Sequence, residues 1–358
     1  MTPISRIADA LAQEHLLPTA RGSSAIWLLL KALDRQGSGV LVPANVCEVV
    51  IAVIENAGYR PVYLDVDPLI GNCRLGDFYA ANTDDVSAVL AVHNYGAPLP
   101  IAEICDWSRA RRMFVIEDVC NAIGATADDR PLGCFGDAAV YSFGMAKIVN
   151  VGGGGALATR DRALLKTCIE LEQSLERWSN AHRARDQAFQ ACLRTIRQYP
   201  ELKEPALYRA LYQSYIPALA AAADPAQSER IAAGLDQLRD NLAARTDCAD
   251  RYRAMLTDPT ISHRPPLPGE VWWRYICHVP KTVRDTVVTE LRAQNLPISH
   301  WYPAVDRLFG QRKHPLAGAD AFEQTVLNLW VEPNADGEDV VERTCDALLR
   351  ALDDRHTQ

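Results

Sequence analysis

Short apolar runs alternate with longer stretches of helical pattern between residues 20 and 160. The runs have the length and composition of buried strands. The strands they predict are Gly39–Val42, Pro61–Leu64, Ala88–Val92, Met113–Ile116, Ala138–Phe143 and Ala156–Thr159. Helices are predicted between them near 24–35, 44–57 and 101–112. This alternation favours a mainly parallel sheet covered on both faces, in which ligands bind beyond the carboxyl ends of the strands.

The pattern becomes helical from about residue 162 to 250. Leu164, Cys168 and Leu171 recur at helical spacing, as do Leu235, Leu238 and Leu242. The segment 176–226 is rich in Ala, Arg and Gln and predicts a helical insertion.

A proline-rich break at Pro265–Pro268 separates this region from the C-terminal part of the chain. A strand at Trp273–Val279 and helices at 281–294 and 337–353 are predicted after it. We therefore expect a large domain over 1–250 that carries the insertion, and a smaller α/β domain over 251–358.

Composition and charge narrow the range of functions. The chain has 358 residues, 48% of them hydrophobic, and a net charge of -8, which argues against a broad nucleic-acid surface. Met1–Ala10 lacks the pattern of a secretory signal, and no apolar stretch approaches the roughly 20 residues of a membrane span. Ten scattered cysteines without paired spacing favour a reducing compartment and no metal site. We expect a cytoplasmic protein with neither membrane nor nucleic acid as a partner.

The most informative stretch is Val115–Asn121, followed by Tyr141–Lys147 and the run Gly152–Gly155. Asp118 comes just past an apolar strand, where its carboxylate can reach into a pocket. A buried carboxylate needs a cationic partner because an unpaired one is costly to desolvate. A protonated pyridine nitrogen would be such a partner.

Lys147 also follows a strand, and the glycines after it let the backbone approach a ligand closely. An amine that loses hydration in a pocket is easier to deprotonate, as imine formation with an aldehyde requires. An Asp facing the ring nitrogen and a Lys forming the Schiff base are the two groups that pyridoxal phosphate most needs from a protein. The hydroxyl of Ser142 is a candidate ligand of the phosphate.

A second candidate phosphate element is Arg21-Gly22-Ser23-Ser24-Ala25, which opens a predicted helix. Backbone N–H groups and the hydroxyls of Ser23 and Ser24 would face an anion at the positive end of the helix dipole. The same residues also serve as a plain helix cap.

An ordered series of motifs resembles the DegT/DnrJ/EryC1/StrS aminotransferases. The motifs are Gly22–Ala25, Val42–Ala44, Ala57–Asp67, Val92–Gly96, Glu117–Asp118, Gly133–Ala139, Ser142–Lys147, Trp301–Pro303 and Asn328–Pro333. The resemblance implies an aspartate-aminotransferase-like fold (pyridoxal-phosphate fold type I), with a mainly parallel seven-stranded sheet and a smaller C-terminal α/β domain. It implies a pyridoxal 5'-phosphate enzyme that moves an amino group from glutamate or glutamine to a keto sugar, mostly nucleotide-linked, and works as a homodimer.

Residue by residue, Lys147 is similar to the Schiff-base lysine and Asp118 to the partner of the pyridine nitrogen. Ser23, Ser24 and Ser142 fall where the family binds the phosphate, and Asn121 where it contacts the phenolic oxygen of the ring. The substrate candidates that follow from the same motifs are His93, Tyr95, Trp301 and Tyr302.

The sequence also departs from the family pattern. Cys47 stands where an aromatic residue usually stacks on the cofactor ring, and a thiol packs with less area. The glycine run lacks its usual Glu, Ala221–Pro225 lacks an Asn-x-Arg motif, and Ala304–Asp306 lacks a His. Divergent substrate recognition is therefore expected.

The alternatives are an aminotransferase for a cyclitol or other non-sugar keto substrate, and a cofactor-binding homologue without turnover that serves assembly or regulation. Members that dehydrate deoxysugars replace the lysine with His, so Lys147 argues against that reaction.

Overall fold

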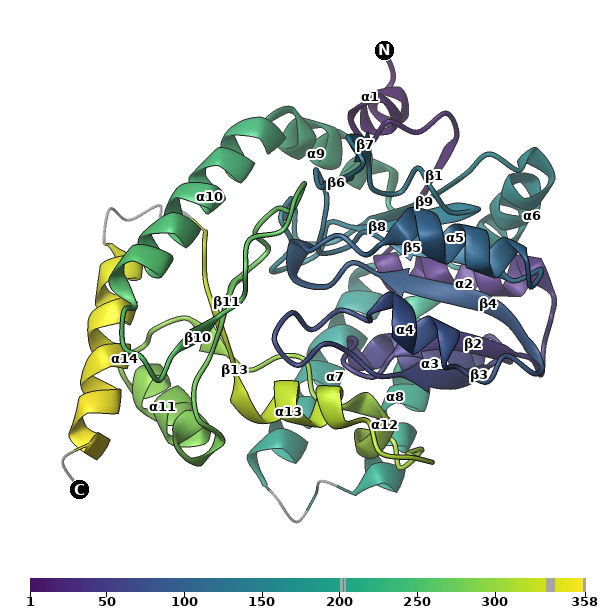
Figure 1. Ribbon diagram of the computed structural model, residues 1–358. Coiled ribbons are helices and arrows are strands. Elements are labelled where there is room, and N and C mark those ends of the chain that lie inside the picture. Colours follow the sequence, from purple (N-terminus) through teal and green to yellow (C-terminus); the bar gives the residue numbers. More distant parts are fainter. Residues whose placement is uncertain (200–201, 203, 333–338, 357–358) are drawn as a thin grey trace.

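A seven-stranded sheet, called here the large sheet, forms the body of the molecule (Figure 1). The computed structural model describes residues 1–358 except 200–201, 203, 333–338 and 357–358. The strand order is β1 (Leu16–Thr19), β9 (Gly155–Thr159), β8 (Ala138–Ser142), β5 (Phe114–Asp118), β4 (Val86–Val92), β2 (Gly39–Pro43) and β3 (Arg60–Leu64). Neighbouring strands from β8 to β3 pair in parallel. Strand β9 pairs antiparallel with both of its neighbours, β8 and β1. The predicted mainly parallel sheet is confirmed.

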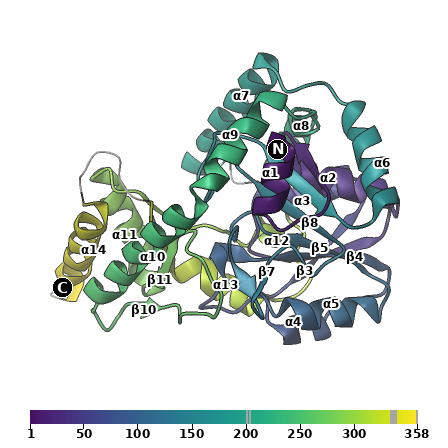
Figure 2. The same cartoon turned by 90° about the horizontal axis from the view of Figure 1, so that it is seen from above.

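Helices cover both faces of the large sheet, as predicted (Figure 2). On one face lie α2 (Gly22–Leu33), α3 (Glu48–Asn56) and α6 (Arg162–Gln173), and on the other α4 (Leu75–Tyr79) and α5 (Ile101–Arg109). The inner strands are buried between these layers, and all five residues of β2 are buried, whereas the edge strands β1 and β3 are partly exposed. Burial on both faces explains why the strands read as continuous apolar runs in the sequence.

A second, antiparallel sheet of four strands, called here the small sheet, follows in the chain. Its order is β10 (Ser262–His263), β11 (Tyr275–His278), β13 (Val326–Leu329) and β12 (Ile298–Ser299). The helices α10 (Leu238–Met255), α11 (Lys281–Ala293) and α14 (Val340–His356) pack around it over a separate hydrophobic cluster. The short helices α12 (Val305–Leu308) and α13 (Ala317–Thr325) instead contribute Val305 and Phe322 to the core of the large sheet, together with Phe309, the C-cap residue of α12.

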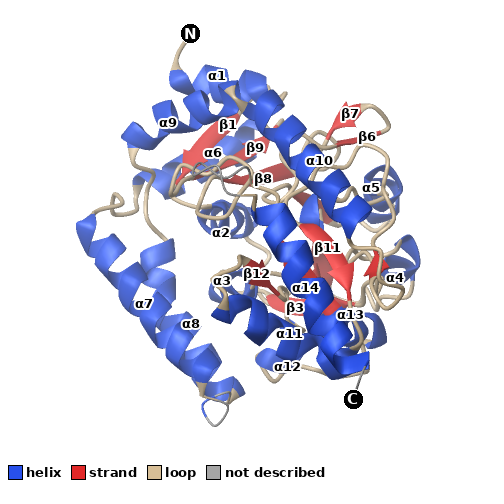
Figure 3. Ribbon diagram, turned by 90° about the vertical axis from the view of Figure 1, so that its left-hand side faces the viewer, coloured by secondary structure: helices blue, strands red, loops and turns tan. Residues whose placement is uncertain are grey.

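The segment 176–226 contains two packed helices, α7 (Asn180–Gln198) and α8 (Pro205–Leu219), which stand together at the edge of the molecule (Figure 3). We call this pair the helical hairpin. Its inner side packs against α3, and the rings of Phe189 and Tyr215 stack at 3.8 Å between its two helices.

Helices α1 (Pro3–Ala10) and α9 (Pro225–Asp236) and a small two-stranded hairpin complete the fold. Helix α1 packs on α9, and the two-residue strands β6 (Thr126–Ala127) and β7 (Arg130–Pro131) form the small hairpin. Among the described residues, no helix combines the length and apolar character of a bilayer span. Nor does that part of the chain bring three or more His, Cys, Asp or Glu side chains together as a metal site.

Several predicted boundaries were wrong. The predicted helix 44–57 begins only at Glu48, because residues 44–47 are held as a loop by the Val305 N–H on the Ala44 carbonyl and by the Asn45 amide on the Gly71 carbonyl. The predicted strand Trp273–Val279 shrinks to β11, since the Trp273 carbonyl accepts hydrogen bonds from Arg245 and Arg274 instead of a strand neighbour. Residues 337 and 338 of the predicted terminal helix, and Pro333 of the last motif, lie outside the described residues.

Candidate active site

A cavity of about 310 Å³ lies where the chain leaves β5 and β8. Two parallel neighbouring strands end there, at Asp118 and Ser142, and Lys147 lies in the loop after β8. The predicted site residues that line the cavity are Ser23, Cys47, Asp118, Ser142, Lys147 and Trp301. Five separate segments of the sequence therefore meet at one cavity.

The amine of Lys147 is held by side chains from two other loops. Its Nζ donates a hydrogen bond to Oδ1 of Asn121 at 2.7 Å, and Nδ2 of Asn121 donates to the hydroxyl of Tyr302 at 3.1 Å. The ring centroid of Trp273 lies 5.7 Å from the same Nζ, within cation–π range. Asn121 therefore fixes the direction of the amine although it does not line the cavity itself.

The carboxylate of Asp118 closes the end of β5. The residue is only 6% exposed, and its Oδ1 accepts a hydrogen bond from the Cys120 N–H at 3.0 Å. Within the part of the chain that the structure describes, no Lys, Arg or His nitrogen forms an ion pair with it. A carboxylate this deep calls for a cation, and it faces the cavity.

The N-terminus of α2 approaches the same cavity very closely. A Cβ on Gly22 would lie 2.9 Å from Sγ of Cys120 and 3.0 Å from Cβ of Ser142, so only glycine permits this approach. Arg21, the N-cap residue, makes no side-chain capping hydrogen bond. The first-turn N–H groups, Ser23 and Ser142 therefore suit an anion such as a phosphate. Ser24 is buried and does not line the cavity.

Tyr302 and Tyr95 lie behind the cavity. The Tyr95 hydroxyl donates to the Trp301 carbonyl at 2.8 Å and accepts from the Tyr302 N–H at 2.9 Å. Burial raises the pKa of both phenols well above its ordinary value, so both stay protonated. Together with the amide of Asn328, which donates to the same Trp301 carbonyl at 2.7 Å, they position Trp301 at the cavity wall.

His93 lies in the core beside Glu117 and not at the cavity. Its Nδ1 accepts from the Leu99 N–H at 3.1 Å, and its Nε2 is 3.4 Å from Oε2 of Glu117. Burial works against ionisation of Glu117, but His93 and backbone N–H groups, including that of Gly136, outweigh it and lower the pKa of this carboxyl. The pair braces the loop before β8.

Cys47 is the N-cap residue of α3. Burial, with the nearby Glu48 carboxylate, raises the pKa of the Cys47 thiol to about 11. The thiol is therefore protonated at neutral pH, which fits a small packing residue.

Sequence reasoning missed the lining residues that the helical hairpin supplies. They are Asp186, Phe189, Gln190, Leu193, Tyr212 and Tyr215. Four of them recur in α7 at the spacing i, i+3, i+4 and i+7, which marks one face of a helix. That spacing was visible in the sequence, but nothing in it showed which surface the face covers.

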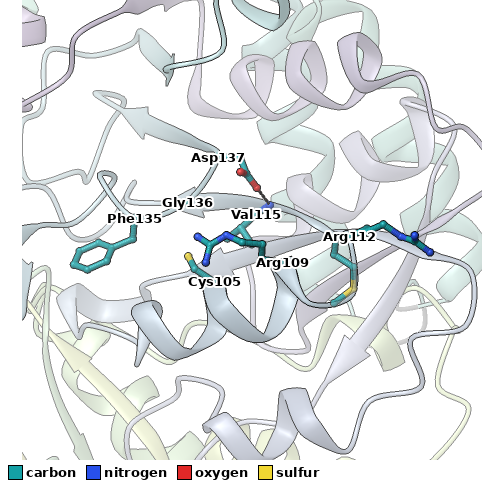
Figure 4. A pocket seen from close by; sticks show the side chains of 8 residues that line it. Cys105, Arg109, Arg112, Val115, Phe135, Gly136 and Asp137 are labelled. Carbon is teal, nitrogen blue, oxygen red and sulfur yellow. Dashed lines mark hydrogen bonds between the residues drawn. The ribbon is translucent and has the colours of Figure 1, made fainter.

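A second cavity, of about 260 Å³, lies beside α5 and shares no lining residue with the first (Figure 4). Asp137 and Val115 close the turn there: Oδ2 of Asp137 accepts from the Val115 N–H at 2.8 Å. Arg109, on its wall, is paired with Asp106. Asp137 and Arg109 at the second cavity are therefore already engaged in contacts that stabilise the fold.

Known proteins similar to this chain point to one family. The model of the DegT/DnrJ/EryC1/StrS aminotransferase family matches residues 5–348. A dTDP-4-dehydro-2,3,6-trideoxy-D-glucose 4-aminotransferase from Saccharopolyspora spinosa is 28% identical over 94% of this chain and 84% of its own length. A GDP-perosamine synthase from Escherichia coli O157:H7 is 28% identical over 47% of this chain, and the match spans only 46% of that relative.

The fold has a close counterpart among solved structures. The aminotransferase TlmJ from Streptoalloteichus hindustanus superposes with a TM-score of 0.81 at 21% identity, over 99% of this chain and 91% of that one. This likeness confirms the predicted fold class, a mainly parallel seven-stranded sheet with a smaller C-terminal part.

Proposed function

Because the chain belongs to the DegT/DnrJ/EryC1/StrS aminotransferase family, we propose that it moves an amino group from glutamate or glutamine to a nucleotide-linked keto sugar. The transaminases of this family depend on pyridoxal phosphate, and Lys147 places the chain with them rather than with the dehydrating members. Relatives named for nucleotide-linked sugars support the acceptor class. The product would serve amino-sugar, glycan or natural-product biosynthesis.

The residues at the cavity fit this cofactor. Asp118 offers a buried carboxylate to a protonated ring nitrogen, and Lys147 offers an amine to an aldehyde. The N-terminus of α2, Ser23 and Ser142 offer donors to a phosphate. When bound, pyridoxal phosphate supplies a ring that draws electrons from the carbon next to the substrate nitrogen.

Lys147 is the proton carrier in this proposal. With donor and cofactor bound, the Nζ of Lys147 would remove the proton from the α-carbon of the donor, and in the second half of the reaction it would deliver a proton to the acceptor carbon. Asn121 keeps that nitrogen directed, because its Oδ1 accepts a hydrogen bond from Nζ at 2.7 Å. Asp118 stabilises the positive ring nitrogen, since a fixed anion beside a cation favours the protonated form.

We further propose that two copies associate and that the enzyme works in the cytoplasm. Pockets at a subunit interface are expected from the family resemblance. Size-exclusion chromatography with light scattering measures the association directly, and a single monomer peak at micromolar concentration would contradict it.

The observation that carries the proposal is one cavity that holds Lys147, Asp118 and an anion-binding helix terminus. The test is the visible absorbance of the purified protein with added pyridoxal phosphate, followed by borohydride reduction and mass spectrometry. The wild type is expected to retain the cofactor covalently on Lys147, and Lys147→Ala to retain none. Lys166→Ala, at an exposed lysine of α6, is the control. Equal labelling of wild type and Lys147→Ala would refute the assignment.

A further inference from the structure

The lining of the cavity divides into two sets that come from different parts of the fold. The first set, which includes Ser23, Asp118, Ser142 and Lys147, comes from segments at the large sheet and carries the cofactor chemistry. The second set comes from the helical hairpin, and it includes Phe189, Gln190, Tyr212 and Tyr215. This second set has no part in the chemistry proposed above.

The hairpin presents an aromatic wall with one amide beside it. The rings of Phe189 and Tyr215 are nearly parallel with centroids 3.8 Å apart, and Tyr212 meets Phe189 edge-on at 5.0 Å. Phe189, Tyr212 and Tyr215 are almost fully buried. Gln190, the next residue along α7, is half-buried and lines the same cavity.

Two ion pairs hold this wall over the cavity. Asp186 of α7 binds Arg21, the N-cap residue of α2, at 2.9 Å, and it accepts a hydrogen bond from the Tyr215 hydroxyl at 2.5 Å. Arg197 of α7 binds the buried Glu48 of α3 at 2.6 Å.

These pairs also neutralise the charges of the hairpin at the cavity. The guanidinium of Arg197 covers the ring of Trp301, with 4.4 Å to its centroid, so the hairpin and Trp301 form a continuous wall. Because Asp186 and Arg197 are already paired, the hairpin presents aromatic ring surfaces and one neutral amide to the cavity.

We propose that Phe189, Gln190 and Tyr215 bind the sugar ring of the acceptor and determine which keto sugar is aminated. This inference rests on the proposed function. A sugar ring has C–H surfaces that pack on aromatic side chains, and hydroxyls that exchange hydrogen bonds with an amide. A wall of aromatic residues with a few placed polar groups is the usual composition of a small-molecule site.

The test separates the two halves of the reaction. In the first half, glutamate converts the bound cofactor, which changes its visible spectrum and releases 2-oxoglutarate. In the second half, a panel of dTDP-, GDP- and UDP-linked keto sugars is offered, and kcat/KM is measured for each. The variants are Gln190→Ala, Gln190→Asn and Phe189→Leu, with Gln187→Ala as a control because Gln187 is an exposed glutamine on the same helix.

Gln190→Ala is expected to lower kcat/KM for the sugar about tenfold, the order of effect of losing a buried hydrogen bond, while the glutamate half-reaction changes less than twofold. Gln190→Asn should recover part of the loss, and Phe189→Leu should lower kcat/KM by a similar factor. Binding of the same sugars to Lys147→Ala, which cannot turn them over, should weaken in parallel when Gln190→Ala is added.

The outcomes are distinguishable. Absence of the first half-reaction in the wild type with both glutamate and glutamine would contradict the proposed function itself. If that half-reaction proceeds and Gln190→Ala behaves like Gln187→Ala toward every accepted sugar, the hairpin does not contact the acceptor and the inference is wrong. If the half-reaction proceeds but no keto sugar is bound or aminated, the assignment of the wall to a sugar ring is likewise overturned.

Discussion

Asn121 connects the reactive amine to the small-sheet side of the site. Replacing it with Ala removes the acceptor of the Lys147 hydrogen bond and the donor to Tyr302. We predict that Asn121→Ala slows the glutamate half-reaction about tenfold or more, because a misdirected amine reaches the α-carbon less often. Stopped-flow absorbance measures this rate. Tyr302→Phe removes only the hydroxyl that accepts a hydrogen bond from Asn121, so it should slow this half-reaction less. An equal loss of rate in both variants would contradict the direct role of Asn121.

Gly22 permits the contact between the N-terminus of α2 and Ser142. A methyl group there would meet Cys120 Sγ at 2.9 Å and Ser142 Cβ at 3.0 Å, so the helix end must shift away. We predict that Gly22→Ala raises the dissociation constant for pyridoxal phosphate about tenfold, by displacing the phosphate donors. Fluorescence titration measures it. Gly76→Ala in α4, where a Cβ would meet nothing within 4 Å, should bind the cofactor like the wild type.

At the residue scale, the sequence was most informative where a side chain directly follows a buried strand. Asp118 and Lys147 could be placed together because parallel strands end at the same edge of a sheet. His93 and Tyr95 also follow a strand, yet they turn into the core, where Glu117 and the ring of Phe322 contact them. The pattern does not tell a cavity-facing loop from a core-facing one, since both are apolar stretches with polar ends.

At the scale of elements, the ion pair between Arg197 and Glu48 joins the helical hairpin to α3. The Glu48 side chain is only 3% exposed, so Arg197→Ala would leave a buried carboxylate without its cation. We predict a loss of stability on the order of 3 kcal/mol, measured as a lower urea midpoint. The exposed Arg194 on the same helix provides the control variant, Arg194→Ala. Adding Glu48→Gln to Arg197→Ala should restore part of the loss, and no recovery would contradict the pairing argument.

The elements that the sequence predicted well are six strands of the large sheet, namely β2, β3, β4, β5, β8 and β9. The seventh strand, β1, was not predicted, because it is four residues long and contains Pro18. A proline is typical of an edge strand and not of a central one. The small-sheet strands β12 and β13 were not predicted, because their partners are distant in sequence and only tertiary pairing defines them. Helical character in 176–226 was predictable, but the packing of this segment over the cavity depends on partners in α2 and α3 that no local pattern reveals.

At the scale of the whole molecule, residues that lie late in the chain pack against the large sheet and its cavity. Trp273, beside the small sheet, contacts Lys147, and α12 and α13 pack in the core of the large sheet although they lie late in the chain. The division at 250/251 stays a prediction about domains. Because segments after the proline-rich break return to the core of the large sheet, composition and that break alone could not predict this packing.

His278 makes a further contact between the two parts. It lies in β11, its Nε2 donates a hydrogen bond to the Leu69 carbonyl at 3.0 Å, and the hydroxyl of Thr325 is 2.8 Å from its Nδ1. Burial lowers the pKa of His278 to about 4. The folded protein therefore keeps this ring neutral at pH values where the unfolded chain already binds a proton.

The sign of the resulting pH dependence follows from that lowered pKa. Stability is complete above the ordinary value of 6.5 and decreases as the pH falls toward 4, because protons then favour the unfolded chain. We predict that His278 accounts for a loss of about 2 kcal/mol between pH 7 and pH 5. Urea unfolding at both pH values should show a smaller difference for His278→Gln than for the wild type. His300, whose pKa burial also lowers to about 4, leaves a residual dependence. The exposed His314 gives the control His314→Gln, and an unchanged pH difference in His278→Gln would contradict the assignment of this pH dependence to His278.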